Sequence, residues 1–451
     1  MSTVAKRSLI LSAAAFVLVG FICFALLFLS GFIPPQVLSD SIRHNALEIE
    51  ERGDYPIFFS ETPKYRYDGF SDSLMLLQSI PDRNLTALEN AVLGPYYALG
   101  IDTPGGSGTG GISPTMALLE KVADPSIENN RNYILYWHGY VVPLRVLLTV
   151  VSPMTIVTLN VFVFILLSVL VFEVFRRTGG LSYGIAFFVA LLVTFSWIVP
   201  LGFKFFTCYL IAFIATLVLY WLLQDDTRRE WIAPFFLTAG LLTAFFDLLT
   251  TPLLTFLLPL SLYLLWVIKR GLEKPFMRTL TAGASWLIGY AGFWATKWLL
   301  AAMVYGAEAT NAEFVSTIAQ RSGTEGVALT YRFGAIYNNL YQLAAIHPDG
   351  SIYMGEFFML TGIALFIAAV IWGLLVKASS TDGEQVKQAL PMLLVALGPY
   401  VWYFFVANHS TFHSWFTYRL QMMSLLAVVF FVLLSVNWTG LHNSNKQFDE
   451  G

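Results

Sequence analysis

The sequence predicts an all-α polytopic membrane protein with about ten transmembrane helices. Three observations carry this prediction. Of the 451 residues, 57% are hydrophobic and only 12% are charged, which is about half the charged share of a soluble domain. Several apolar tracts reach the roughly 20 residues that cross a bilayer as a helix. Connections rich in Lys and Arg also alternate along the chain with connections that have almost none.

Ten apolar tracts are expected to span the membrane: 9–32, 153–174, 182–200, 206–224, 231–250, 253–268, 280–303, 355–376, 389–406 and 419–437. The first tract follows Lys6 and Arg7, is too long for a cleaved signal peptide, and is therefore expected to be an uncleaved signal-anchor. With ten spans, the basic clusters fall on one side. Because positive loops stay in the cytoplasm, both termini are expected there.

Two segments are too long for simple connections between spans: 33–152 after the first span and 304–354 after the seventh. Both are expected on the extracytoplasmic side, and the first is expected to form helices on the membrane surface. The whole chain, 1–451, is interpreted as one integral membrane domain. No basic patch indicates nucleic-acid binding, and Cys23 and Cys208 imply no disulfide framework.

The first long loop contains three acidic candidates for chemistry. Asp68 and Asp72 are spaced i, i+4 in YDGFSDSLML, and Asp40 follows the first span closely enough to lie near the membrane surface. Asp72 is expected at the start of a helix, where a carboxylate serves either as an N-cap or as a base or cation ligand. The sequence leaves both interpretations open.

Asp247 lies inside the apolar tract FFDLLTTPL. A charged side chain in the membrane costs roughly 2.5–3.5 kcal/mol on insertion scales, and such residues usually face a site or a pathway. Asp247 is expected either to cap the next half-helix, to pair with a buried Lys, or to line the same cavity as Asp72.

A polar and aromatic cluster, NHSTFHSWFTYR, separates the last two predicted spans. His409 and His413 have the i, i+4 spacing of metal ligands, but no third ligand follows them. Trp415 is typical of a membrane interface. Arg419, at the mouth of a span, suits a phosphate group because a guanidinium binds it bidentately.

The segment YWHGYVVPLR repeats this mixture of aromatic and basic residues near the membrane surface. It contains Trp137, His138 and Arg145. Lys204 is a further basic residue on the expected extracytoplasmic side. Single basic residues in such places also bind anionic lipid or extend to the interface, so each is a candidate rather than an assignment.

The loop plan resembles the GT-C superfamily of membrane glycosyltransferases, which have a long first exterior loop and often a second large loop after the seventh span. The motifs YDGFSDSLML, WHGYVVPLR, FFDLLTTPL and NHSTFHSWFTYR also resemble uncharacterised bacterial membrane proteins grouped with these enzymes. The resemblance implies a catalytic acid in the first exterior loop. It also implies a sugar donor on polyprenyl phosphate, held by basic residues at the exterior face.

We therefore expect an inverting glycosyl transfer at the outer face of the cytoplasmic membrane, from a polyprenyl-phosphate sugar donor to a cell-envelope glycan or lipid acceptor. The expected catalytic acids are Asp72, Asp68 and Asp40. The expected donor-phosphate ligands are Arg419, Arg145, Lys204, His138, His409 and His413. The expected acceptor cavity includes Asp247, Trp415 and Trp137. A divalent cation, Mg²⁺ or Mn²⁺, is considered as cofactor without assigned ligands.

Two other functions remain open from the sequence. A lipid-linked polysaccharide polymerase or ligase would depend more on exterior Arg and His than on an acid. A transporter or flippase would use Asp247 for ion coupling, but it predicts polar residues at mid-depth in several spans. Here the polar residues cluster at the predicted exterior ends.

Overall fold

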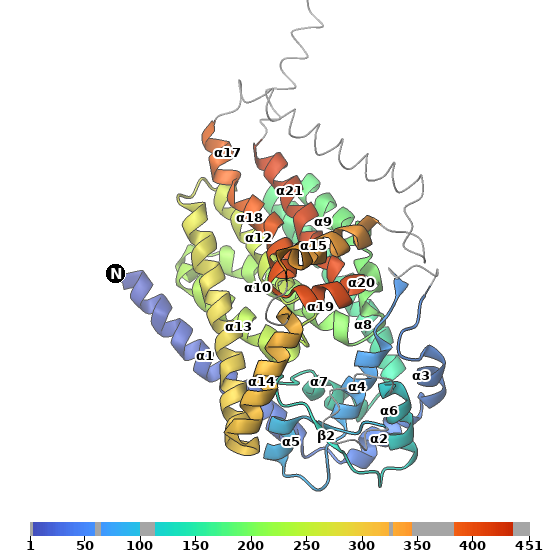
Figure 1. Cartoon of the computed structure of the whole chain (residues 1–451). Helices are drawn as coiled ribbons and strands as arrows, with labels where there is room; N and C mark the ends of the chain where they lie inside the picture. Colours follow the sequence, from blue (N-terminus) through green and yellow to red (C-terminus); the bar gives the residue numbers. More distant parts are fainter. Residues whose placement is uncertain (1–2, 59–64, 100–112, 324–327, 345–382, 436–451) are drawn as a thin grey trace, which may run out of the picture.

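The computed structural model describes residues 3–58, 65–99, 113–323, 328–344 and 383–435. Helices make up most of this part, and its only sheet is a short antiparallel pair, β1 (Pro95–Tyr96) and β2 (Arg131–Asn132). The helices form a bundle with a smaller lobe at one end (Figure 1). The predicted all-α class is confirmed.

Six helices of the described chain are long and apolar enough to cross a membrane. They are Ala5–Ser30, Pro153–Gly179, Lys204–Leu223, Pro275–Tyr305, Gly383–Phe405 and Ser414–Ser435. Two further apolar helices, Leu181–Val193 and Leu254–Lys269, are shorter. These helices agree with a multi-pass membrane protein, and the count of ten spans stays a prediction.

The lobe is built from the segment between the first two long helices. Its helices are α2 (Pro35–Arg43), α3 (Ala46–Arg52), α4 (Gly69–Ser79), α5 (Ala87–Leu93), α6 (Pro114–Ala123) and α7 (Val141–Leu148). The described part of the segment contains short helices, and their expected position on the membrane surface stays a prediction. Their apolar faces pack with α1, α11 and α13 into one core that includes Leu76, Leu118, Phe245 and Phe293. Each such buried side chain contributes roughly 1.5–3 kcal/mol, so the lobe is held firmly to the bundle.

The bundle and the second long segment contain the remaining elements. They are α1 (Thr3–Ser30), α8 (Pro153–Gly179), α9 (Leu181–Val193), η2 (Ser196–Leu201), α10 (Lys204–Leu223), η3 (Asp226–Trp231), α11 (Ile232–Phe246), α12 (Leu254–Lys269), α13 (Pro275–Tyr305), α14 (Ala307–Ser322), α15 (Leu329–Ala344), α17 (Gly383–Ala389), α18 (Pro391–Phe405), α19 (Ala407–Phe412), α20 (Ser414–Thr417), η4 (Tyr418–Gln421) and α21 (Met422–Ser435).

Two of the predicted spans form shorter helices than expected, for local reasons. In the tract 182–200, α9 ends before Phe195, whose left-handed φ of 53° turns the chain into η2. In the tract 231–250, α11 ends at Asp247, whose side chain accepts the backbone N–H of Thr250 and so makes a turn. The predicted span 355–376 lies outside the described residues.

Helices α11 and α13 pack closely because each places a glycine against the other's backbone. A Cβ on Gly240 would lie 2.1 Å from the Trp286 carbonyl oxygen, and a Cβ on Gly289 would lie 2.0 Å from that of Leu237. Small residues at such positions let membrane helices approach closely. Since α13 leads directly into α14, this pair fixes where α14 begins.

The predicted basic connections meet at one end of the bundle. Arg7 lies 3.9 Å from Glu230, and Arg270 lies 3.7 Å from Asp226. The ammonium of Lys269 lies 5.4 Å from the ring centre of Tyr183. The lobe lies at the opposite end of α10. This separation is what the alternating charge pattern predicts, whichever side each end faces.

Candidate functional site

A cavity of about 610 Å³ lies where the lobe meets α14 and the segment between α18 and α21. Its walls come from parts of the sequence that are far apart: the lobe, the start of α10, the turn after α11, α14 and the segment 408–415. The lining residues include Tyr55, Asp68, Phe70, Ser71, Tyr96, Tyr97, Tyr133, Lys204, Glu313, Gln320, Arg321, Asn408, His409, His413 and Trp415. Five of the residues predicted from the sequence are among them: Asp68, Lys204, His409, His413 and Trp415.

A buried ion pair forms one wall of the cavity. The Lys204 ammonium donates to Oδ2 of Asp68 at 2.8 Å and to the Ser71 hydroxyl at 3.0 Å. The other carboxylate oxygen of Asp68 accepts the backbone N–H of Ser71 at 3.0 Å, so Asp68 is also the N-cap of α4. Both charged side chains are at most 8% exposed. Each charge therefore offsets much of the other's cost of burial.

Asp72 has a different place from the one predicted. It lies one turn into α4 and caps α10, with its two oxygens accepting the backbone N–H groups of Phe203 and Lys204 at 3.0 Å each. Burial raises the pKa of Asp72 to about 7, although these N–H groups and the Lys204 charge act in the opposite direction. Asp72 is not among the lining residues, so the N-cap interpretation describes it, with α10 rather than α4 as the capped helix.

A basic cluster faces the ion pair from other elements. Nη1 of Arg321, at the end of α14, lies 3.1 Å from Nδ1 of His409. Because a guanidinium only donates, Nδ1 of His409 accepts. The rings of His409 and His413 have centres 4.7 Å apart. Burial, with added repulsion from the charges of Lys204 and Arg321, lowers the pKa of His413 to about 3.

Aromatic side chains form much of the remaining wall. Tyr55 stacks on Phe70 with ring centres 5.8 Å apart. The rings of Tyr55 and Trp415 meet edge to face, with centres 6.1 Å apart. On another side, Tyr97 donates from its hydroxyl to Glu120 at 2.9 Å. The cavity thus combines charged groups with flat apolar faces and hydroxyls, a combination that suits a polar ligand with a ring.

Two predicted phosphate ligands in the lobe make internal contacts and do not line the cavity. Arg145 is 2% exposed and donates to Ser30 Oγ and to the carbonyl oxygens of Gln78 and Ser79, which ties α7 to α1 and to the end of α4. His138 contacts the Tyr133 carbonyl through Nε2 and the Tyr140 hydroxyl through Nδ1. The structure thus gives both side chains positions inside the packed lobe.

Arg419 and Trp137 also lie away from the cavity lining. Arg419 is 2% exposed and donates to the Trp415 carbonyl at 3.2 Å. Trp137 stacks on Phe293 with ring centres 4.5 Å apart and donates to that residue's carbonyl. Both large side chains lie in the packed interior. The sequence instead predicts that they face a binding site.

The last two predicted acids are likewise outside the cavity lining. Asp40 is half exposed on α2. Its Oδ1 accepts a hydrogen bond from the side-chain amide of Gln36 and lies 3.2 Å from Nη1 of Arg43. Asp247 accepts the backbone N–H and the hydroxyl of Thr250. Asp247 thus closes the turn after α11 through Thr250, which differs from the expected cap of the next half-helix, since that helix begins at Leu254.

The described residues contain no group of three or more His, Cys, Asp and Glu side chains placed to hold a metal ion. His409 has Nδ1 directed at the guanidinium of Arg321, which occupies that lone pair. The two histidines therefore do not form a ready pair of metal ligands in this arrangement.

Sequence reasoning missed two charged residues of the cavity, Arg321 and Glu313. Both lie on α14, in the second long segment. Arg321 and Arg332 are its only Lys or Arg residues, a signal that singles out both arginines. Nothing in the sequence separates them, because the contact with His409 joins residues 88 positions apart.

Comparison with known proteins gives no match to any family model, curated protein or solved structure.

Proposed function

We propose that the chain is a glycosyltransferase that moves a sugar from a polyprenyl-phosphate donor to an envelope glycan or lipid acceptor. The single observation that carries the proposal is the cavity, which joins a buried carboxylate–ammonium pair to an arginine and two histidines beside aromatic walls. Such a transfer needs a proton acceptor and a group that receives developing phosphate charge, and the cavity offers both within one space.

Asp68 is the proposed base. It lines the cavity, and its carboxylate is held in place by the Lys204 ammonium and the backbone N–H of Ser71. In the reaction, the acceptor hydroxyl oxygen bonds to the anomeric carbon from the face opposite the phosphate. The bond between that carbon and the phosphate oxygen breaks, the electron pair leaves with the lipid phosphate, and the hydroxyl proton passes to Asp68. The configuration of the anomeric carbon is inverted.

Arg321 is the proposed ligand of the departing phosphate, in place of Arg419 and Arg145. It lines the cavity, whereas those two side chains donate to internal carbonyl groups. Charge on the phosphate grows as the glycosidic bond breaks, so a guanidinium aimed at it stabilises the transition state more than the ground state. Lys204 supports the same charge from the opposite wall. We assign no metal ion to this step.

We further propose that the lobe faces outward from the cytoplasmic membrane and that both termini are cytoplasmic. The support is the gathering of Arg7, Lys269 and Arg270 contacts at the end of the bundle away from the lobe. Cysteine labelling from outside the cell tests this orientation. A cysteine replacing exposed Leu47 in the lobe should react with a membrane-impermeant maleimide, and one replacing Lys387 should not.

The test of the function is release of polyprenyl phosphate from synthetic polyprenyl-phosphate monosaccharides, measured by mass spectrometry with cell membranes as the acceptor source. The wild-type chain should release the lipid phosphate, and Arg321→Gln should lose most of that activity. The matched control is Arg332→Gln, in the same segment, whose guanidinium donates to the Phe404 carbonyl and does not line the cavity.

Equal loss in both arginine variants, or release that Arg321→Gln leaves unchanged, would contradict the phosphate assignment. Activity that survives Asp68→Asn but is lost in Arg321→Gln would favour the polymerase or ligase alternative, which needs no carboxylate base.

A further inference from the structure

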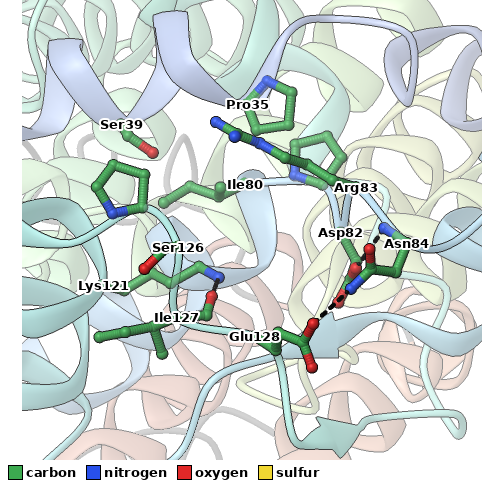
Figure 2. Close-up of a pocket in the computed structure, with 12 residues that line it drawn as sticks. Pro35, Ser39, Ile80, Asp82, Arg83, Asn84, Lys121, Ser126, Ile127 and Glu128 are labelled. Atoms are coloured by element: carbon green, nitrogen blue, oxygen red, sulfur yellow. Dashed lines mark hydrogen bonds between the residues drawn. The ribbon is translucent and has the colours of Figure 1, made fainter.

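A second, smaller pocket lies in the lobe, away from the cavity described above. Its volume is about 160 Å³, the share of about five water molecules in the liquid. It is formed by α2, the turn 80–84, the end of α6 and the turn 125–128, and Figure 2 shows its lining. We call it the α2–α6 pocket. It shares no lining residue with the large cavity.

Two deeply buried polar side chains line the α2–α6 pocket. Ser39 is 1% exposed, and no described residue forms a hydrogen bond with its hydroxyl. Lys121 is 7% exposed, and its ammonium contacts the carbonyl oxygen of Ile127 (Figure 2). Asp82, Asp124 and Glu128 lie near enough to act on the charge of Lys121, but none of these described residues forms a salt bridge with it. A buried ammonium that no carboxylate contacts directly is costly, and an anion bound against it would offset part of that cost.

The rim of the pocket carries charges of both signs. Arg83 lies on one side, with Nη2 donating to Gln36 at 3.2 Å. Asp82 and Glu128 lie on the other side and are joined through Asn84, whose backbone N–H and side-chain amide donate to them (Figure 2). Each of these bonds uses one carboxylate oxygen, so each acid keeps a second oxygen for a ligand.

The lining is therefore cationic around Lys121 and Arg83 and anionic around Asp82 and Glu128. A simple anion would satisfy only the first pair, and a simple cation only the second. A phosphate joined to a primary amine by a short link satisfies both. With about eight non-hydrogen atoms, a phosphoethanolamine group also suits the space of about five waters.

We propose that the α2–α6 pocket binds a phosphoethanolamine group, with its phosphate on Lys121, Ser39 and Arg83 and its ammonium on Asp82 and Glu128. The group has two sources, a phospholipid headgroup or a soluble phosphate ester. The headgroup is within geometric reach, because α2 begins at Pro35, directly after the membrane-spanning α1 ends at Ser30. This proposal does not depend on the glycosyltransferase assignment.

The test is isothermal titration of the full chain in phospholipid-free detergent with phosphoethanolamine, inorganic phosphate and phosphocholine. Phosphoethanolamine should bind about tenfold more tightly than the other two, because only its ammonium donates charge-assisted hydrogen bonds to the acids. Glu128→Gln should remove this preference, and Arg83→Gln should weaken all three ligands. Arg7→Gln, at the other end of the bundle, is the control and should change nothing.

Equal binding of phosphoethanolamine and phosphocholine would overturn the proposal, as would affinities unchanged in Glu128→Gln and Arg83→Gln. Native mass spectrometry from nanodiscs of phosphatidylethanolamine and phosphatidylcholine separates the two sources. A phosphatidylethanolamine molecule that is retained by the wild type and lost in Glu128→Gln identifies the lipid headgroup. Binding of the soluble ester without such retention identifies the ester, and the absence of both refutes the site.

Discussion

The ammonium of Lys204 lies 2.8 Å from Oδ2 of Asp68, across 136 positions of sequence. Lys204 is the first residue of α10, and Asp68 precedes the first turn of α4. The backbone N–H of the same Lys204, with that of Phe203 before it, donates to Asp72 on α4. The two aspartates of the YDGFSD motif thus share one task, fixing α4 to α10, but only Asp68 also lines the cavity.

The two aspartates should respond differently to the same substitution. Asp68→Asn keeps a side chain able to cap α4 but removes the proposed base, so transfer per folded molecule should fall about 10²–10⁴-fold. It also leaves the buried Lys204 ammonium without its counter-charge, which should destabilise the chain by about 3–5 kcal/mol. Asp72→Asn replaces one acceptor oxygen of the α10 cap with an amide donor, so it should destabilise the chain by about 1–2 kcal/mol. Thermal unfolding followed by tryptophan fluorescence, together with the lipid-phosphate release assay, checks both. An equal loss of activity per folded molecule in Asp68→Asn and Asp72→Asn would argue against this division of roles.

Gly202 should not tolerate a larger residue. A Cβ there would lie 1.1 Å from the Tyr67 hydroxyl and 2.4 Å from Oδ2 of Asp72, so Gly202→Ala must displace the α10 cap. We expect poor yield of folded protein and lost activity. Gly334→Ala is the control, because no atom lies within 4 Å of its Cβ position and alanine favours the helix by about 1 kcal/mol. Size-exclusion profiles in detergent compare the two. A Gly202→Ala protein as stable as Gly334→Ala would refute the described packing.

The lobe should lose stability in acid through His138. Burial, with repulsion from Lys297, lowers the pKa of His138 from 6.5 to about 3. The folded chain therefore binds fewer protons than the unfolded chain between these values. Stability is fully present above pH 6.5 and falls as the pH drops toward 3. Apparent melting temperatures of wild type and His138→Gln, measured from pH 4.5 to 7.5, should show a shallower slope for the variant. Parallel slopes would assign the acid sensitivity to other groups.

Arg145 should prove structural. Its guanidinium donates to three buried acceptors, and Arg145→Met would leave them unsatisfied at about 1–3 kcal/mol each. We expect faster proteolysis within the lobe and a lower melting temperature. Activity per folded molecule should be retained, as measured on the monodisperse fraction. A stable but inactive Arg145→Met protein would instead support the predicted role of Arg145 as a ligand of the donor phosphate.

Much of the helical architecture could be predicted from composition and hydropathy, because a bilayer allows few alternatives to apolar helices. The helix lengths were harder to predict. Hydropathy runs through Phe195 and Asp247 without a break, yet a left-handed φ and an Asx turn end the helices there. Local hydrogen bonds of this kind compete with the helix and leave no mark on average hydropathy.

The site was predicted in part. The motifs around Asp68 and His409 do meet at one cavity. Arg145 and Arg419 look the same in sequence but bind internal carbonyl groups. Whether a basic residue faces a cavity or the chain's own backbone depends on long-range packing, which spacing along one sequence does not encode.

The cap that Asp72 places on α10 also has a consequence for biogenesis. The lobe leaves the ribosome before α10 does, so the carboxylate exists before the two N–H groups that it accepts. Until the lobe docks, α10 has inserted with an open amino-terminal turn, and Lys204 stands without Asp68 at the bilayer edge. Docking of the lobe is therefore the step that completes the amino-terminal end of this helix. A chain stalled before α10 would hold a lobe that has α1 to pack against but lacks the surfaces of α10, α11 and α13.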